Sequence, residues 1–145
     1  MYSIKITKMT LDDLNNIASI LISDFDDFWT FDIFKSEIEN SSSYYFVAKK
    51  DNEIVGFAGI KVILDEADIM NIVVKKSFRN CGIASLLLSH LINFSRSLNM
   101  SFITLEVCET NLPAIHLYEK FGFKNVGLRK NYYGNLSGIL MTLKI

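Results

Sequence analysis

Proline, glycine and cysteine are all scarce in this sequence. Its 145 residues include one Pro, seven Gly and two Cys, whereas half of them are hydrophobic. Such a composition excludes a collagen-like or disordered chain. The two cysteines, Cys81 and Cys108, are too few for a disulfide framework or a cysteine-based zinc site, so we expect no metal and a reducing, cytoplasmic setting.

Charge of one sign and long apolar segments are also missing. The 15 basic and 16 acidic side chains leave a net charge of −1, which gives no general attraction to nucleic acid. No apolar run approaches the roughly 20 residues that cross a bilayer, and the first residues lack the apolar segment of a signal peptide. We therefore expect no direct nucleic-acid binding and no membrane attachment. A chain of this length has room for one domain with a substantial core.

The spacing of apolar residues predicts the elements along the chain. A period of two predicts strands, and apolar positions three or four apart predict helices. We expect strands over 2–9, 44–50, 54–64, 67–74, 101–108, 123–133 and 138–145, and helices over 11–23, 30–40, 83–98 and 111–121. This order, β-α-α-β-β-β-α-β-α-β-β, implies an α/β (α+β) fold. Its mixed central sheet would have about seven strands, accompanied by four helices, with a parallel crossover around the third helix.

The stretch 72–87 carries the first chemical signal. A β-branched run leads into a short loop that contains Arg79 and Gly82, and a helix is expected to begin at Ile83. Unpaired N–H groups at a helix start, a glycine that allows close approach of the backbone, and a positive charge together suit an anion such as phosphate. From this segment alone, an ordinary strand-to-helix turn is an equal alternative.

An acidic and aromatic stretch covers residues 24–40. It holds six acidic side chains against the single Lys35, with five aromatic residues interleaved among them. This pattern fits a solvated acidic face above an aromatic core. A groove that receives a cationic acceptor is the alternative, and the two interpretations are compatible.

The later motifs resemble those of the GNAT (GCN5-related N-acetyltransferase) superfamily. Arg79-Asn80-Cys81-Gly82-Ile83-Ala84 matches its pyrophosphate loop, in which Arg or Gln is followed by two variable residues, Gly, one variable residue and Gly or Ala. The likeness continues through Leu105-Glu106-Val107, Asn111, 114–123 and 129–133. Over about 69–133 the chain is similar to the bacterial enzymes that acetylate the N-terminal alanine of a ribosomal protein. The resemblance implies a single GNAT domain over 1–145 that uses acetyl-CoA as co-substrate and no metal.

By this resemblance, two parts of the chain would bind the coenzyme. The end of a strand would hold the acetyl and pantetheine part, the loop would wrap the pyrophosphate, and later side chains would complete the site. The implied residues are Ile72, Val73, Val74, Arg79, Asn80, Cys81, Gly82, Ile83, Ala84, Asn111 and Tyr118. Main-chain N–H groups would provide most of the grip on the phosphates, so we expect Cys81 to be a bystander rather than a nucleophile.

Glu106 and Tyr118 are the predicted catalytic residues. An α-amine with a pKa of about 8 is mostly protonated near neutral pH and must lose a proton before it attacks a thioester. Glu106, a lone acid in an otherwise apolar strand, is the candidate base. The departing thiolate needs a nearby proton or hydrogen bond, which Tyr118 could supply. The alternatives are a strand-end acid with a local donor and a core aromatic residue.

Four aromatic residues are predicted to contact the acceptor, namely Phe28, Trp29, Tyr132 and Tyr133. The expected acceptor is the N-terminus of a basic protein or peptide, and the expected enzyme is a monomer or weak dimer. The segment after Tyr133 is shorter than is usual in the ribosomal subfamily. A small amine, such as a polyamine or antibiotic, is therefore an alternative acceptor. A non-catalytic acyl-CoA-binding regulator is an alternative of another class.

Overall fold

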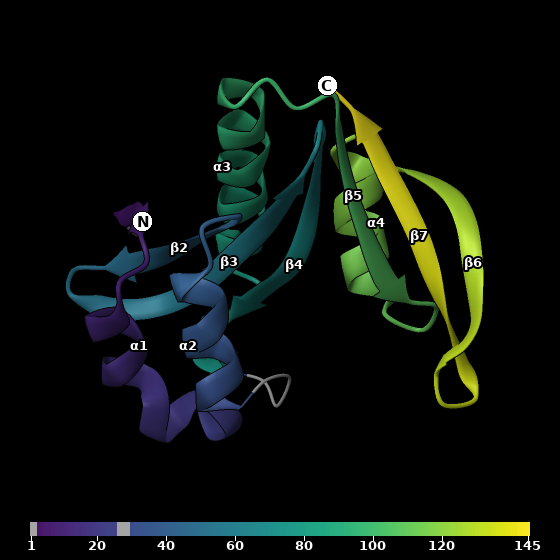
Figure 1. Cartoon of the computed structure of the whole chain (residues 1–145). Helices are drawn as coiled ribbons and strands as arrows, with labels where there is room; N and C mark the ends of the chain where they lie inside the picture. The colour runs from purple at the N-terminus through teal and green to yellow at the C-terminus, as the bar shows by residue number, and fades with distance from the viewer. Residues whose placement is uncertain (1–2, 26–29) are drawn as a thin grey trace. The chain divides into compact units, whose positions relative to one another are not determined.

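The fold contains a mixed seven-stranded sheet and four α-helices within residues 3–25 and 30–145, which the computed structural model describes (Figure 1). The strands are hydrogen-bonded in the order β1-β2-β3-β4-β5-β7-β6. The elements are β1 (Ile4–Lys8), α1 (Leu11–Ile17), η1 (Ala18–Ile20), η2 (Leu21–Phe25), α2 (Phe31–Glu39), β2 (Ser43–Lys50), β3 (Glu53–Ile63), β4 (Glu66–Val74), η3 (Lys76–Phe78), α3 (Ile83–Ser97), β5 (Phe102–Cys108), α4 (Leu112–Lys120), β6 (Lys124–Tyr133) and β7 (Leu136–Lys144). The predicted fold class and order of elements are confirmed.

The chain divides into two compact units, which are described separately. The first unit comprises the residues up to 61 together with 70–93, and the second comprises 62–69 together with 94–145. The first therefore holds the loop before α3. The second holds β5, α4, β6 and β7.

Aromatic side chains form the centre of the first unit. Its core cluster takes residues from the two N-terminal helical segments and from β2, β3 and β4. The ring of Phe34 lies 5.4 Å from that of Tyr45 and 5.0 Å from that of Phe57, measured between centroids. Phe25 and Phe34 are fully buried. The aromatic-core interpretation of the 24–40 stretch thus holds for these two residues, whereas Phe28 and Trp29 lie outside the described residues.

The first helix departs from the predicted span of 11–23. Thr10 caps it as expected, because its hydroxyl accepts from the Asp13 N–H at 3.1 Å and the Asp13 carboxylate accepts from the Thr10 N–H at 2.9 Å. The α-helix nevertheless ends at Ile17, and the chain continues as a 3-10 turn and then a π-helical turn. This change of pitch keeps both Leu21 and Phe25 buried. Tertiary burial therefore overrides the local helical pattern here.

The second unit is built on β5. The first residues of β4 pair with β5 in parallel, and β7 lies antiparallel to β5 on its other side and pairs with β6. Figure 1 shows α4 beside this group of strands. Ile103, Leu105 and Val107 are buried, which confirms the predicted alternation along β5. On the opposite face Thr104, Glu106 and Cys108 are half-buried, and Phe102 is exposed.

The final hairpin differs from the prediction in two respects. The last strand begins at Leu136 rather than Gly138, so the turn consists of Gly134 and Asn135. The preceding strand is not regular, because its register with β7 shifts between Arg129 and Tyr133. Asn131 has a φ of 54° in this stretch. Asn tolerates left-handed backbone better than most residues, which explains its place in the irregularity.

We predict that Gly59→Ala destabilises the first unit. Gly59 pairs with Tyr45 across β2 and β3, and an added Cβ would overlap the buried Tyr45 ring. Overpacking of this kind costs about 1–3 kcal/mol. Chemical denaturation followed by circular dichroism will measure the change in free energy of unfolding. In a Tyr45→Leu background the added cost should shrink, and an unchanged free energy of unfolding in the single variant would contradict the packing argument.

Candidate active site

The loop between β4 and α3 presents its main chain to the solvent. Asn80 and Gly82 both have left-handed backbone, with φ values of 62° and 81°. The carbonyl of Gly82 accepts the first helical hydrogen bond, from the Leu86 N–H at 3.2 Å, so the N–H groups just before Leu86 have no intrahelical acceptor. A Cβ on Gly82 would meet no atom within 4 Å. The loop is therefore an open site for an anion.

The other predicted coenzyme residues of the first unit frame this loop. Ile72, Val74 and Ala84 are half-buried, Val73 and Ile83 are buried, and Asn80 and Cys81 are exposed. The buried side chains anchor both ends of the loop in the core. The exposed ones leave its centre accessible, which is the arrangement that recognition through main-chain N–H groups requires.

Two carbonyl oxygens accept hydrogen bonds from the guanidinium of Arg79. Its Nε donates to the carbonyl oxygen of Val74 at 3.2 Å, and its Nη2 donates to the carbonyl oxygen of Phe25 at 3.2 Å. These two hydrogen bonds hold the guanidinium at the start of the loop.

Glu106, in the second unit, has two carboxylate oxygens in different environments. Oε1 lies 3.3 Å from Nη2 of Arg129. Oε2 is buried and has no hydrogen-bond partner in the part of the chain that the structure describes. Gly138 makes room for it, since a Cβ at that position would lie 2.7 Å from Oε2. One oxygen is therefore held by a cation while the other can accept a proton or hydrogen bond.

Two phenols lie in the same unit as this carboxylate. Burial raises the pKa of Tyr118 to about 12, with the Tyr133 phenol adding to the effect. Burial also raises the pKa of Tyr133, and the negative charge of Glu106 adds to that shift. Tyr133 thus lies within electrostatic reach of both predicted catalytic residues, although the sequence assigned it only to acceptor binding.

The remaining predicted residues have identifiable positions. Asn111 caps α4, because its Oδ1 accepts from the Ala114 N–H at 3.4 Å, and its contact with coenzyme stays a prediction.

Tyr132 is half exposed and lies under the guanidinium of Arg129, 4.6 Å from it. The rings of Tyr132 and Tyr133 meet edge to face at 4.9 Å. Arg129 lies in the segment 129–133, which resembles the family, but the sequence did not predict its pairing with Glu106.

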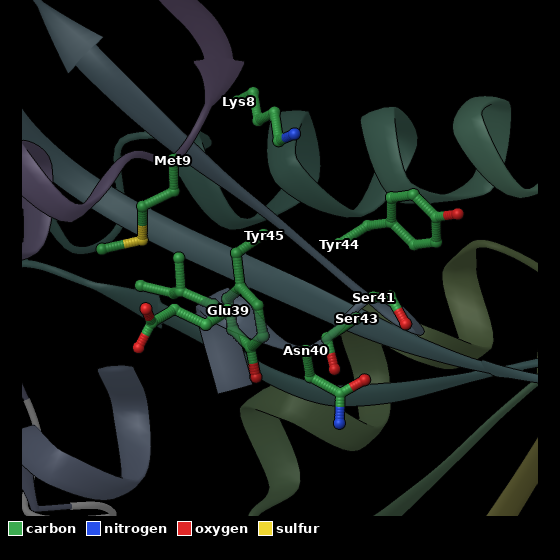
Figure 2. Close-up of a pocket in the computed structure, with 9 residues that line it drawn as sticks. Lys8, Met9, Glu39, Asn40, Ser41, Ser43, Tyr44 and Tyr45 are labelled. Atoms are coloured by element: carbon green, nitrogen blue, oxygen red, sulfur yellow. The ribbon is translucent and has the colours of Figure 1, made fainter. Parts of the chain in front are cut away.

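A separate pocket of about 220 Å³ lies in the first unit (Figure 2). Its walls come from the ends of β1 and α2 and from the start of β2, with Asn40, Ser43 and Tyr44 among the lining residues. It contains no residue of the predicted coenzyme or catalytic sets. Within residues 3–25 and 30–145, no group of three or more His, Cys, Asp or Glu could hold a metal ion. No helix in this part of the chain is long and apolar enough to span a membrane.

Comparison with known proteins identifies the class. The model of the acetyltransferase (GNAT) family matches residues 14–123. The chain therefore belongs to this family, and it is an N-acetyltransferase that uses acetyl-CoA as co-substrate. Binding of the pyrophosphate of this coenzyme by the open loop before α3 stays a prediction.

Within that class, similar proteins share one name. The ribosomal protein bS18-alanine N-acetyltransferase of Haemophilus influenzae is 39% identical over 112 residues, which cover 76% of this chain and 74% of that protein. The protein of that name from Escherichia coli is 36% identical over 104 residues, covering 69% of this chain and 70% of its own. The crystal structure of the Escherichia coli ribosomal-protein-S18-alanine N-acetyltransferase matches with a TM-score of 0.90, at 29% identity. That match covers 99% of this chain and 94% of the crystal chain.

We predict that Tyr118 titrates late. Its pKa rises from 10.0 to about 12, so the folded protein holds this proton where the unfolded chain releases it. The resulting contribution to stability is complete below pH 10 and is lost as the pH rises towards 12. The difference in ultraviolet absorbance between wild type and Tyr118→Phe should show the missing phenol titrating near pH 12. A midpoint near 10 would contradict the burial of this hydroxyl.

Proposed function

We propose that this protein acetylates the N-terminal α-amine of the ribosomal protein bS18, with alanine as the first residue, and that residues 1–145 form a single N-acetyltransferase domain. The observation that carries this proposal is the buried Oε2 of Glu106, which has no hydrogen-bond partner within residues 3–25 and 30–145, in a chain whose relatives are named for that reaction. The bacterial relatives and the ribosomal acceptor support a cytoplasmic setting.

Glu106 acts as the base in this proposal. An ammonium group of the acceptor gives a proton to Oε2, directly or through water, and the neutral amine then attacks the thioester carbonyl. Arg129 holds Oε1, so the carboxylate cannot turn its other oxygen away from the acceptor. Main-chain N–H groups at Val73 or Val74 receive the developing oxyanion. Overall, one acceptor proton is released, and the other product is the free thiol.

Tyr118 acts on the leaving sulfur. A thiolate has a reference pKa of about 8.5, well below the value of about 12 at which Tyr118 loses its proton. Full transfer of the phenolic proton to the thiolate is therefore uphill. The phenol stabilises the departing sulfur chiefly by donating a hydrogen bond, and solvent protonates the free thiolate.

A small amine is the second candidate acceptor. The turn of the final hairpin is only Gly134 and Asn135, and this short connection is the observation that favours it. The charge argument for a cationic peptide is also weakened in the first unit. Glu37 lies 3.7 Å from Nζ of Lys61, and Asp24 lies 3.8 Å from Nζ of Lys75.

Glu106→Gln should lower kcat/KM by about 10²- to 10⁴-fold, because it removes the base but keeps the shape of the side chain. Tyr118→Phe should lower it less, since a hydrogen bond to sulfur is lost while the ring remains. Release of free thiol from acetyl-CoA in the presence of peptide measures both. Glu119→Gln, an exposed acid on the same helix as Tyr118, is the control and should keep wild-type activity. Unchanged turnover in both Glu106→Gln and Tyr118→Phe would contradict the proposed roles of these two residues.

A peptide that carries the first residues of bS18 should be the best acceptor. We expect acetylation of the Ala-initiated form to exceed that of otherwise identical Ser- and Met-initiated forms, because a larger first residue must be placed beside Glu106. Mass spectrometry of the products measures the rates and locates the acetyl group. Equal or faster turnover of a free polyamine would favour the small-amine alternative.

A further inference from the structure

The side chain of Arg129 reaches Glu106 across the strand that lies between them. Arg129 pairs with Gly138 of β7, and Gly138 pairs on its other side with Cys108 of β5. Gly138 brings no side chain to this position, and Nη2 of Arg129 lies 3.3 Å from Oε1 of Glu106. The side chain of Arg129 is 55% exposed, whereas that of Glu106 is 17% exposed. Because a solvated cation gains little from one ion pair, this contact alone does not fix the guanidinium.

The ring of Tyr132 is a second support for this guanidinium. Cζ of Arg129 lies 4.6 Å from the centroid of the ring, which is a cation–π distance. In a regular strand, residues three positions apart point to opposite faces of the sheet. Here the register of β6 with β7 shifts between Arg129 and Tyr133, and Asn131 has a φ of 54°. The irregular backbone therefore places an aromatic face against the cation that contacts Glu106.

Tyr133 in turn contacts the Tyr132 ring. The two rings meet edge to face, with centroids 4.9 Å apart and planes at 89°. One face of the Tyr132 ring is thus covered by Arg129, and Tyr133 restricts how the ring can turn. These contacts are made by the protein itself, so the covered face is not available to an acceptor.

We infer that Tyr132 is a positioning residue, which acts on the base through Arg129 rather than by contact with the acceptor. This inference rests on the proposed function, in which Oε2 of Glu106 takes a proton from the acceptor amine. The ring contacts the guanidinium, and the guanidinium contacts Oε1, so the ring restricts rotation of the carboxylate. A general base must lie within hydrogen-bond reach of the proton it removes, and loss of this support therefore slows the chemical step.

Steady-state kinetics with acetyl-CoA and an Ala-initiated bS18 peptide test this role. Tyr132→Leu should lower kcat about two- to fivefold, the factor that corresponds to an exposed cation–π contact, and should leave the KM of the peptide unchanged. Tyr132→Phe keeps the aromatic face and should restore the wild-type kcat. Arg129→Gln should lower kcat at least as much as Tyr132→Leu. In the Arg129→Gln or Glu106→Gln background, Tyr132→Leu should have no further effect, because the three side chains act as one unit.

Lys130→Gln is the matched control for Arg129→Gln, because it removes the charge of the next residue, which is also exposed, and it should keep the wild-type kcat. Tyr132 is 50% exposed, so Tyr132→Leu should leave the melting temperature measured by circular dichroism nearly unchanged.

Three results would each overturn the inference and leave acetyl transfer to the peptide standing. The first is an unchanged kcat in Tyr132→Leu, and a raised KM in that variant would assign the ring to the acceptor. The second is a loss in Tyr132→Phe equal to that in Tyr132→Leu, and the third is a full effect of Tyr132→Leu in the Arg129→Gln background. A wild type that transfers no acetyl group to any peptide overturns the proposed function itself.

Discussion

The second unit depends on one constraint, the burial of a carboxylate oxygen, Oε2 of Glu106, that has no partner among the residues that the structure describes. Leaving a buried acceptor unsatisfied costs about 1–3 kcal/mol, and more for a charged group. Arg129 lowers that cost by holding Oε1 of Glu106, and Gly138 leaves the space that Oε2 occupies. The buried row on the opposite face of β5 supplies the packing that offsets the remainder. Packing on the other face of the sheet thus helps to hold the Glu106 carboxylate in place.

The first unit differs from the second, because its predicted site is formed by main-chain groups rather than by a side chain. Its predicted anion site consists of main-chain groups, whose positions are set by backbone conformation rather than by side-chain identity. The left-handed residues Asn80 and Gly82 shape the loop, and the buried Ile83 fixes the start of the helix. Cys81 is exposed in the middle of this loop. Its Sγ lies 3.6 Å from the carbonyl oxygen of Arg79, and its role as a bystander stays a prediction.

Much of the fold could be predicted because alternation and helical spacing are local signals. The buried row of β5 and the cap at Thr10 are read from residues a few positions apart. The early end of α1 could not be predicted, because it follows from the burial of Leu21 and Phe25 against distant strands. The pairing of Glu106 with Arg129 depends on strand register across β7, and no local pattern encodes it. The predicted residues Phe28 and Trp29 lie outside the described residues, and coenzyme contacts stay predictions throughout.

The irregular register of β6 determines where the length of the final hairpin can change. Pairing with β5 fixes β7 from Gly138 onward, where Glu106 lies opposite Leu140. The tip of the hairpin, beyond Arg129, pairs back onto β7 only after the shift at Asn131. Residues can therefore be inserted or removed at the tip without moving the register that aligns the carboxylate. The length of the hairpin tip and the alignment of Glu106 on β5 can thus change independently of each other.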